Sequence, residues 1–244
     1  MERDDKFPDK NISGRLSADA PEETAGLSLP DGMMLRRDEQ GLVLERDGQS
    51  MRGDFEHLLP RLKAGRLGSE LLVRAARLRG LDHEPVAIDA TAGMGEDSLL
   101  LAAAGFTVYL FEKDPVIALL LADTLERSAH HPDLAGIVSR MHLTQGDSLE
   151  WLPRLQSGLN PDVILLDPMF PARSKSALVR KKFQILHGLE RPCEDEEALL
   201  AAALAAGAHK IVIKRPLKGP YLAGRRPDYS LSGKAVRYDC IVLA

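Results

Sequence analysis

One stretch, residues 86–97, constrains the fold of this chain more than any other. Its sequence is VAIDATAGMGED: an apolar run ends in Asp89, small residues follow, and an apolar-periodic segment continues from Leu99 to Ala104. This order predicts a strand, a tight turn and a helix. Gly93 and Gly95 permit backbone angles and a close ligand approach that a Cβ would block. The stretch therefore predicts the first strand-to-helix turn of a nucleotide-binding α/β sheet.

The charge of this turn indicates which nucleotide it suits. A dinucleotide fingerprint requires a third glycine at position 98, where the chain has Ser98. Glu96 and Asp97 stand at the start of the predicted helix, where their carboxylates would repel a pyrophosphate. S-adenosylmethionine (SAM) has no phosphate and carries an ammonium and a sulfonium, which suit acidic surroundings. The turn therefore favours SAM over NAD and disfavours a nicotinamide oxidoreductase.

Composition restricts the class of protein. The chain has 244 residues, of which 44% are hydrophobic and 28% are charged, as in ordinary soluble proteins. We find neither an apolar run of membrane-spanning length nor the basic-then-apolar order of a signal peptide, so a cytoplasmic protein without a membrane partner is expected. Cys193 and Cys240 match no metal spacing, so they are expected to be buried or incidental thiols, with no metal site.

The order of apolar segments predicts the domain organisation. Residues 1–30 are polar and are expected to be mobile, and residues 31–60 are expected to form a small N-terminal β subdomain with strands near 33–35 and 42–44. Residues 61–244 form the predicted main domain. Its expected helices are 69–79, 96–104, 115–125 and 195–206. Its expected strands are 86–90, 107–111, 141–144, 163–166 and 210–214, with an antiparallel hairpin from 229–231 and 236–243. The alternation of strands and helices implies a parallel sheet.

Ligands of open α/β sheets bind at the carboxyl ends of the strands, and five of these predicted ends carry a charged residue. These residues are Asp89, Glu112, Asp147, Asp167 and Lys214. The shape of SAM suggests how they divide: Glu112 for the ribose hydroxyls with Lys113 along the same edge, and Asp147 with Ser148 for adenine. Asp89, Glu96 and Asp97 would surround the methionine end. For each acid, a helix cap or a surface salt bridge is the alternative.

A second feature follows the strand at 163–166, where the sequence continues Asp167-Pro168-Met169-Phe170. An acid and an aromatic on a rigid turn suit a planar substrate with an exocyclic amine, because the carboxylate accepts the N–H protons while Phe170 stacks on the ring. The pattern resembles the Asp/Asn-Pro-Pro-aromatic signature of amino-directed methyltransferases, with Met169 at the third place. The alternative is a strand-ending turn with a core phenylalanine.

Charge is unevenly distributed along the chain. The formal net charge is −4, yet residues 171–182 carry basic side chains and no acid, and residues 207–239 contain only two acids, Asp228 and Asp239. Such segments either bind phosphates or form a solvated face.

Four motifs together resemble the ribosomal RNA small subunit methyltransferase J (RsmJ) family. They are residues 89–97, residues 167–171, residues 175–182 and residues 212–216. The resemblance implies a class I methyltransferase, Rossmann-like fold: a mostly parallel seven-stranded sheet with helices on both faces and a small N-terminal appendage. It also implies SAM-dependent methylation of N2 of a guanosine near the 3′ end of 16S ribosomal RNA, free or in the small subunit. Where Glu96 stands, the family more often has arginine.

The resemblance also assigns site residues. It implies cofactor binding by Glu96, Asp97, Glu112, Lys113, Asp147, Ser148 and Asp167, and the arguments from the glycine turn and the strand ends add Asp89, Gly93 and Gly95 to the expected cofactor site. The expected catalytic residues are Asp167, which orients the amine, Phe170, which stacks, and Lys214, a candidate contact to a phosphate or a base edge. The expected RNA-binding residues are Arg173, Lys175, Arg180, Lys181, Lys182 and Arg215.

Two other functions remain open from the sequence. One is an amino-methyltransferase acting on another RNA, on a protein amide or on a small heterocycle, and the last two substrates would need no basic rim. The other is an RNA-binding module without catalysis, against which the intact strand-end acids argue. The sequence predicts no oligomeric state.

Overall fold

The computed structural model describes residues 27, 29–157, 160–168, 189 and 195–243. The expectation of mobility for residues 1–30 falls mostly outside this part of the chain. The predictions for Phe170, the basic run from Arg173 to Lys182, and Cys193 also lie outside it, so they stay predictions.

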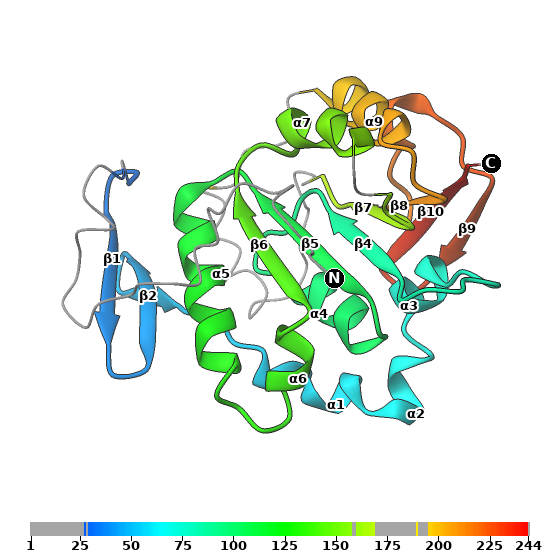
Figure 1. The fold of residues 1–244 in the computed structure, drawn as a ribbon. Helices are drawn as coiled ribbons and strands as arrows, with labels where there is room; N and C mark the ends of the chain where they lie inside the picture. The colour runs from blue at the N-terminus through cyan, green and yellow to red at the C-terminus, as the bar shows by residue number, and fades with distance from the viewer. Residues whose placement is uncertain (1–26, 28, 158–159, 169–188, 190–194, 244) are drawn as a thin grey trace.

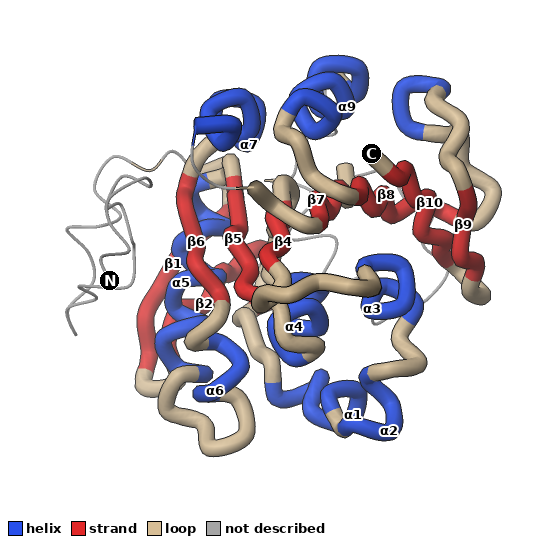
Figure 2. Tube along the Cα trace, turned by 45° about the vertical axis from the view of Figure 1, so that its right-hand side comes forward, coloured by secondary structure: helices blue, strands red, loops and turns tan. Residues whose placement is uncertain are grey.

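Seven strands form one sheet in the order β6-β5-β4-β7-β8-β10-β9 (Figures 1 and 2). They are β4 (Val86–Asp89), β5 (Thr107–Glu112), β6 (Met141–Gln145), β7 (Val163–Leu166), β8 (Lys210–Pro216), β9 (Tyr229–Ser232) and β10 (Val236–Val242). Strands β6, β5, β4, β7 and β8 are parallel, and β10 is antiparallel to β8 and β9. The predicted sheet and its C-terminal hairpin are therefore confirmed.

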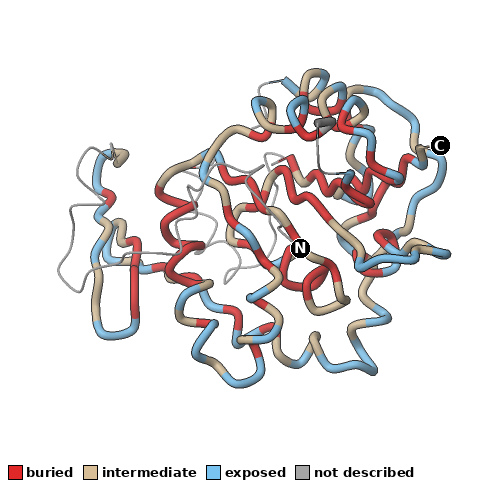
Figure 3. The backbone as a smooth tube through the Cα atoms, in the orientation of Figure 1, coloured by how far each residue is buried: buried red, intermediate tan, exposed pale blue. Residues whose placement is uncertain are grey.

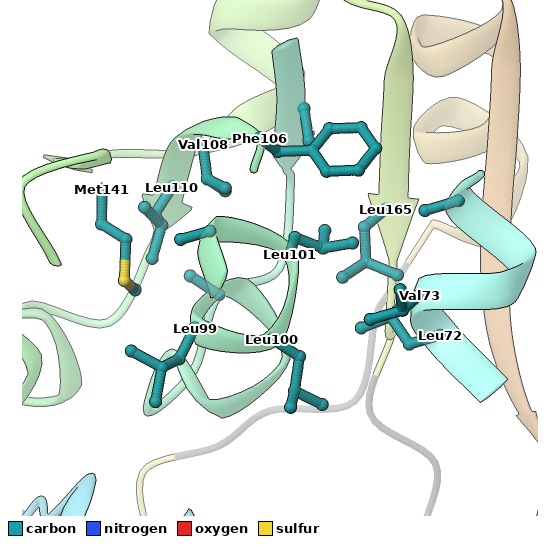
Figure 4. Close-up of a cluster of buried hydrophobic side chains, with 14 of the residues drawn as sticks. Leu72, Val73, Leu99, Leu100, Leu101, Phe106, Val108, Leu110, Met141 and Leu165 are labelled. Carbon is teal, nitrogen blue, oxygen red and sulfur yellow. The ribbon is translucent and has the colours of Figure 1, made fainter. Parts of the chain in front are cut away.

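Helices cover both faces of this sheet, as predicted. Helices α3 (Leu71–Ala76), α4 (Glu96–Ala103) and part of α5 (Pro115–Ser128) share one apolar cluster with Ala87 of β4 (Figure 4). Helix α9 (Glu196–Ala205) packs on Ile88 from the opposite face. Neighbouring residues of one strand thus enter different clusters, since side chains alternate along a strand. Figure 3 shows the central strands β4, β7 and β8 as mostly buried.

The remaining helical elements are short. They are η1 (Glu56–Leu58), α1 (Leu59–Leu62), α2 (Ala64–Leu67), α6 (Ala135–Val138), α7 (Ser148–Trp151), η2 (Leu152–Ser157) and η3 (Leu222–Gly224). Within the described residues, no helix combines the length and apolar character that crossing a membrane requires.

Local capping explains where α5 begins and where α3 ends. Asp114 accepts hydrogen bonds from the backbone N–H groups of Val116 and Ile117, and Pro115 occupies the first turn, so α5 begins where the proline predicts. Helix α3 is shorter than the predicted 69–79. Its last carbonyls are satisfied by Lys210, whose Nζ lies 3.0 Å from the Ala75 oxygen and 2.7 Å from the Arg77 oxygen.

A small antiparallel sheet of β1 (Met33–Asp38), β2 (Gly41–Arg46) and β3 (Gln49–Met51) confirms the predicted N-terminal hairpin. It packs on α5 through an apolar cluster that joins Leu44 to Leu120. Buried Asp123 of α5 accepts a hydrogen bond from the Leu42 N–H at 3.0 Å. The appendage is thereby attached to the main sheet through α5.

This attachment leaves no room for a side chain at Gly53. A Cβ there would overlap Thr124 Oγ1 and lie 2.9 Å from Met94 Cε. We therefore expect Gly53→Ala to lower the free energy of unfolding by about 1–3 kcal/mol, measured by urea denaturation. Gly65→Ala is the control, because no described atom lies within 4 Å of its Cβ position. Equal unfolding midpoints for the two variants would contradict this packing.

Candidate active site

Five predicted site residues lie at one edge of the sheet. Asp89 and Glu112 end β4 and β5, and Lys214 lies near the end of β8. Asp167 follows β7 directly, and Asp147 lies two residues after the end of β6. Because these strands are parallel and adjacent, their carboxyl ends lie side by side. The structure therefore brings together residues that are up to 125 positions apart in the sequence.

The glycine turn after β4 adopts the conformations that glycine favours. Gly93 has φ +53° and Gly95 has φ +75°, and a Cβ at Gly95 would lie 2.7 Å from Leu121 Cδ1. None of the described atoms lies within 4 Å of a Cβ built at Gly93, so the turn is open on that side. The turn thus leaves the half-buried backbone of Gly93 open to a ligand next to the first turn of α4.

Glu112 holds this turn against β5. Its carboxylate accepts hydrogen bonds from the Gly93 and Asp114 N–H groups, both at 2.7 Å. Burial raises the pKa of Glu112, and these N–H donors oppose that rise. Each carboxylate oxygen has two lone pairs, so holding the turn is compatible with accepting ribose hydroxyls.

Asp89 supports the turn from the interior. It is buried, and its two oxygens accept hydrogen bonds from Ser98 Oγ at 2.6 Å and the Thr91 N–H at 3.1 Å. Burial raises the pKa of Asp89 to about 7. This environment favours an indirect role for Asp89 over the predicted contact with the cofactor. Ser98 occupies the position where a dinucleotide fingerprint would have glycine, and its hydrogen bond to Asp89 links α4 to β4.

Asp147 takes the alternative role of a helix cap as well. Its Oδ1 accepts from the Leu149 N–H at 3.0 Å at the start of α7, and its Oδ2 lies 3.0 Å from Lys113 Nζ. Lys113 is three-quarters exposed, whereas Ser148 is buried. The structure therefore places Asp147 and Ser148, the residues predicted to bind adenine, next to Lys113.

Lys214 bridges two acids across the centre of the site. Its Nζ lies 2.6 Å from Asp97 Oδ2 and 2.9 Å from Asp167 Oδ2. Burial alone would lower the pKa of Lys214, but the two carboxylates outweigh it and raise that pKa well above its ordinary value. Burial raises the pKa of Asp167, and the Lys214 ammonium opposes that rise. Lys214 is thus committed to carboxylates, which argues against its predicted contact with an RNA phosphate.

Two further residues at the site were not predicted. The Thr91 hydroxyl accepts a hydrogen bond from the Asp167 N–H at 2.7 Å, which ties the turn after β7 to the glycine turn. His57 of η1 places its Nε2 3.4 Å from Oε1 of Glu96, which lies in the first turn of α4. Neither contact has a local sequence signal, because each joins segments far apart in the chain.

The RNA contact predicted for Arg215 is not supported. Its side chain is fully buried, with Nη1 at 3.2 Å from Glu196 Oε1 and Nε donating to the Pro220 oxygen at 2.9 Å. Residues alternate along β8, so Arg215 faces the α9 side while Lys214 faces the site. Lys214 and Arg215 are therefore both paired with carboxylates of the protein, on opposite faces of the strand.

Several known proteins are similar to this chain in sequence. The family described as "Putative SAM-dependent methyltransferase" matches residues 30–243. A ribosomal RNA small subunit methyltransferase J from Thioalkalivibrio sulfidiphilus is 39% identical over 93% of this chain and 91% of that protein. Its namesake from Pseudomonas fluorescens is 42% identical over 82% of this chain and 79% of that protein.

A solved structure is similar to this chain in both fold and sequence. The crystal structure of a SAM-dependent methyltransferase from Neisseria gonorrhoeae matches with a TM-score of 0.70 and 31% sequence identity, covering 88% of this chain and 85% of that one. The predicted class I methyltransferase fold and the resemblance stated from the motifs are both confirmed. The chain therefore belongs to the ribosomal RNA small subunit methyltransferase J family of SAM-dependent methyltransferases.

Proposed function

We propose that this protein methylates the exocyclic N2 of a guanosine in small-subunit (16S) ribosomal RNA in the cytoplasm. The names of its relatives support an RNA substrate of this class. The observation that carries the choice of an amine is the Asp167 carboxylate, held by Lys214 at the end of β7 with 34% of its side chain exposed. A fixed, accessible acceptor of this kind suits N–H donors.

The residues at the carboxyl ends of the parallel strands fit SAM. The open glycine turn at Gly93 accommodates a ligand against the backbone. Glu96 and Asp97, in the first turn of α4, supply negative charge for an ammonium, and Glu112 supplies acceptors for hydroxyls. When bound, SAM supplies a methyl group made electrophilic by its sulfonium.

The chain contributes position and a proton acceptor. Asp167 would accept a hydrogen bond from the guanine N2 amine and so direct its lone pair toward the methyl group. N2 gains the methyl carbon and loses one proton, which the Asp167 carboxylate is placed to receive. A paired guanine hides this amine, so the target base must be unpaired or flipped out of its helix.

Methyl transfer from radiolabelled SAM tests this proposal. The purified protein should label 16S ribosomal RNA, offered free and as the small subunit, and should leave large-subunit RNA and ribosomal proteins unlabelled. Label in the protein fraction would favour the protein-amide alternative. No transfer to either RNA preparation would contradict the proposed function.

A further inference from the structure

The loop that follows β8 presents an aromatic side chain at the edge of the sheet that carries the site. Residues 217–221 begin three positions after Lys214, and Tyr221 is 40% exposed and Leu217 38% exposed. We propose that this loop is a nucleotide subsite, where an unpaired base of the RNA stacks on Tyr221 and Lys218 pairs with phosphate. The inference rests on the proposed function, because it adds a second contact to the same RNA.

Two buried arginines hold this loop in one conformation. Arg237 Nη1 donates to the carbonyl oxygens of Pro216, Leu217 and Gly219 at 2.9–3.0 Å. Arg215 Nε donates to the Pro220 oxygen at 2.9 Å. Buried guanidinium groups need compensating partners, and here loop carbonyls supply many of them. The loop is therefore preorganised, which reduces the entropy lost when a ligand binds.

The Tyr221 ring is supported on the protein side. The Arg237 guanidinium carbon lies 5.1 Å from the ring centroid, a cation–π distance. Asp239 pairs with Arg237 Nε at 2.9 Å, which keeps the arginine in place. A ring held in this way and still exposed is a stacking surface of the kind that binds single-stranded nucleic acid.

A hollow of about 380 Å³ adjoins the ring. Its lining includes Leu217, Lys218, Tyr221, Ser230 and Ser232. The hollow is shallow and open to solvent, so a base stacked on Tyr221 would remain partly exposed. Apolar, aromatic, hydroxyl and ammonium groups therefore meet in one place, which suits a base, its ribose and a phosphate.

The charge around the loop favours RNA over a protein or lipid partner. The Leu217 N–H donates to the Ala235 oxygen at 3.1 Å, which places exposed Lys234 beside Lys218. Between residues 217 and 235 the one acid is Asp228, which accepts from the Val242 N–H at the other end of β10. Glu196 of α9 also reaches this segment, where it accepts from the Ala223 N–H at 3.1 Å, but its other oxygen lies 3.2 Å from Arg215 Nη1. Local positive charge with an aromatic ring is the usual composition of RNA-binding surfaces.

Binding of a labelled single-stranded RNA oligonucleotide, followed by fluorescence anisotropy, tests the subsite. Tyr221→Ala should raise the Kd about tenfold, and Tyr221→Phe should leave it within about twofold, because stacking needs the ring and not the hydroxyl. Lys218→Ala should reduce the slope of log Kd against log salt concentration by about one. Abasic nucleotides in the oligonucleotide should abolish the difference between wild type and Tyr221→Ala.

Tyr229→Ala is the matched control. Tyr229 is 39% exposed and also lies near a cation, with Lys210 Nζ 5.9 Å from its ring, but it begins β9 at the opposite end of the sheet. Its Kd for RNA should equal that of wild type. Thermal unfolding of each variant identifies any general loss of structure, and Tyr221→Phe keeps the packing on Arg237.

The two proposals fail in different ways. If wild type methylates 16S ribosomal RNA while Tyr221→Ala retains its Kd and its KM for RNA, the subsite is wrong and the proposed function stands. If Tyr221→Ala instead weakens self-association in sedimentation with RNA binding intact, the loop is a protein interface and the subsite is again overturned. If no RNA is methylated, the proposed function fails, and the oligonucleotide Kd still decides whether Tyr221 binds RNA.

Discussion

Asp167→Ala is expected to lower kcat by about 10²–10⁴-fold, the range typical of losing a proton-transfer residue. Asp167 follows β7, and its backbone N–H donates to the Thr91 hydroxyl. Its carboxylate lies 2.9 Å from Lys214 Nζ, which also contacts Asp97. Without it the amine has neither an orienting acceptor nor a place for its proton. Single-turnover methyl transfer at saturating RNA measures the effect on chemistry.

Two controls accompany this variant. S-adenosylhomocysteine binding, measured by calorimetry, should be weakened but still measurable, because the glycine turn and Glu112 are unchanged. Glu39→Ala removes an exposed acid from the turn between β1 and β2 and should leave kcat unaltered. Near-normal turnover of Asp167→Ala would remove Asp167 from the mechanism.

Lys214→Met is expected to lower kcat on the order of 10²-fold near neutral pH, because Asp167 loses the partner that positions it. It should also change the pH profile. The Lys214 ammonium opposes the rise that burial causes in the pKa of Asp167, so its removal raises that pKa further. A smaller fraction of Asp167 is then ionised at a given pH, and the acidic limb of the rate profile moves to higher pH.

The pH profile distinguishes this role from a purely structural one. The deficit of Lys214→Met should be larger at pH 6 than at pH 9, and Lys214→Arg should restore part of the rate and of the limb position. A uniform loss at every pH would indicate misfolding or a different role for Lys214. Arg61, which pairs with Glu70 at 2.8 Å near the site, remains in both variants and provides the same background charge.

Much of the fold follows from local patterns in the sequence. Strands β4, β5, β7 and β8 contain apolar runs bounded by turn residues, and Asp114 and Pro115 mark the start of α5. The carboxyl-edge location of Asp89, Glu112, Asp147 and Asp167 then follows from topology, because parallel strands align their carboxyl ends. These strands, the start of α5 and the positions of the four acids can therefore be predicted without knowing which distant residues are in contact.

The roles of the charged residues could not be predicted in the same way. Lys214 and Arg215 are neighbours of like charge, yet one enters the site and the other is buried against Glu196. Which one faces the site depends on strand register and on partners far along the chain. Asp89 likewise ends a strand like the other acids, but Ser98 and burial assign it to support of the turn.

The central claim is that Asp167 directs methylation to an exocyclic amine of a ribosomal guanosine. Mass spectrometry of nucleosides from 16S ribosomal RNA, treated with the protein and SAM, tests it most directly. We expect N2-methylguanosine to form with wild type and to fall by at least about 10²-fold with Asp167→Asn. Methyl groups on a ring nitrogen, a ribose oxygen or a carbon, or equal N2-methylguanosine from both proteins, would contradict the account.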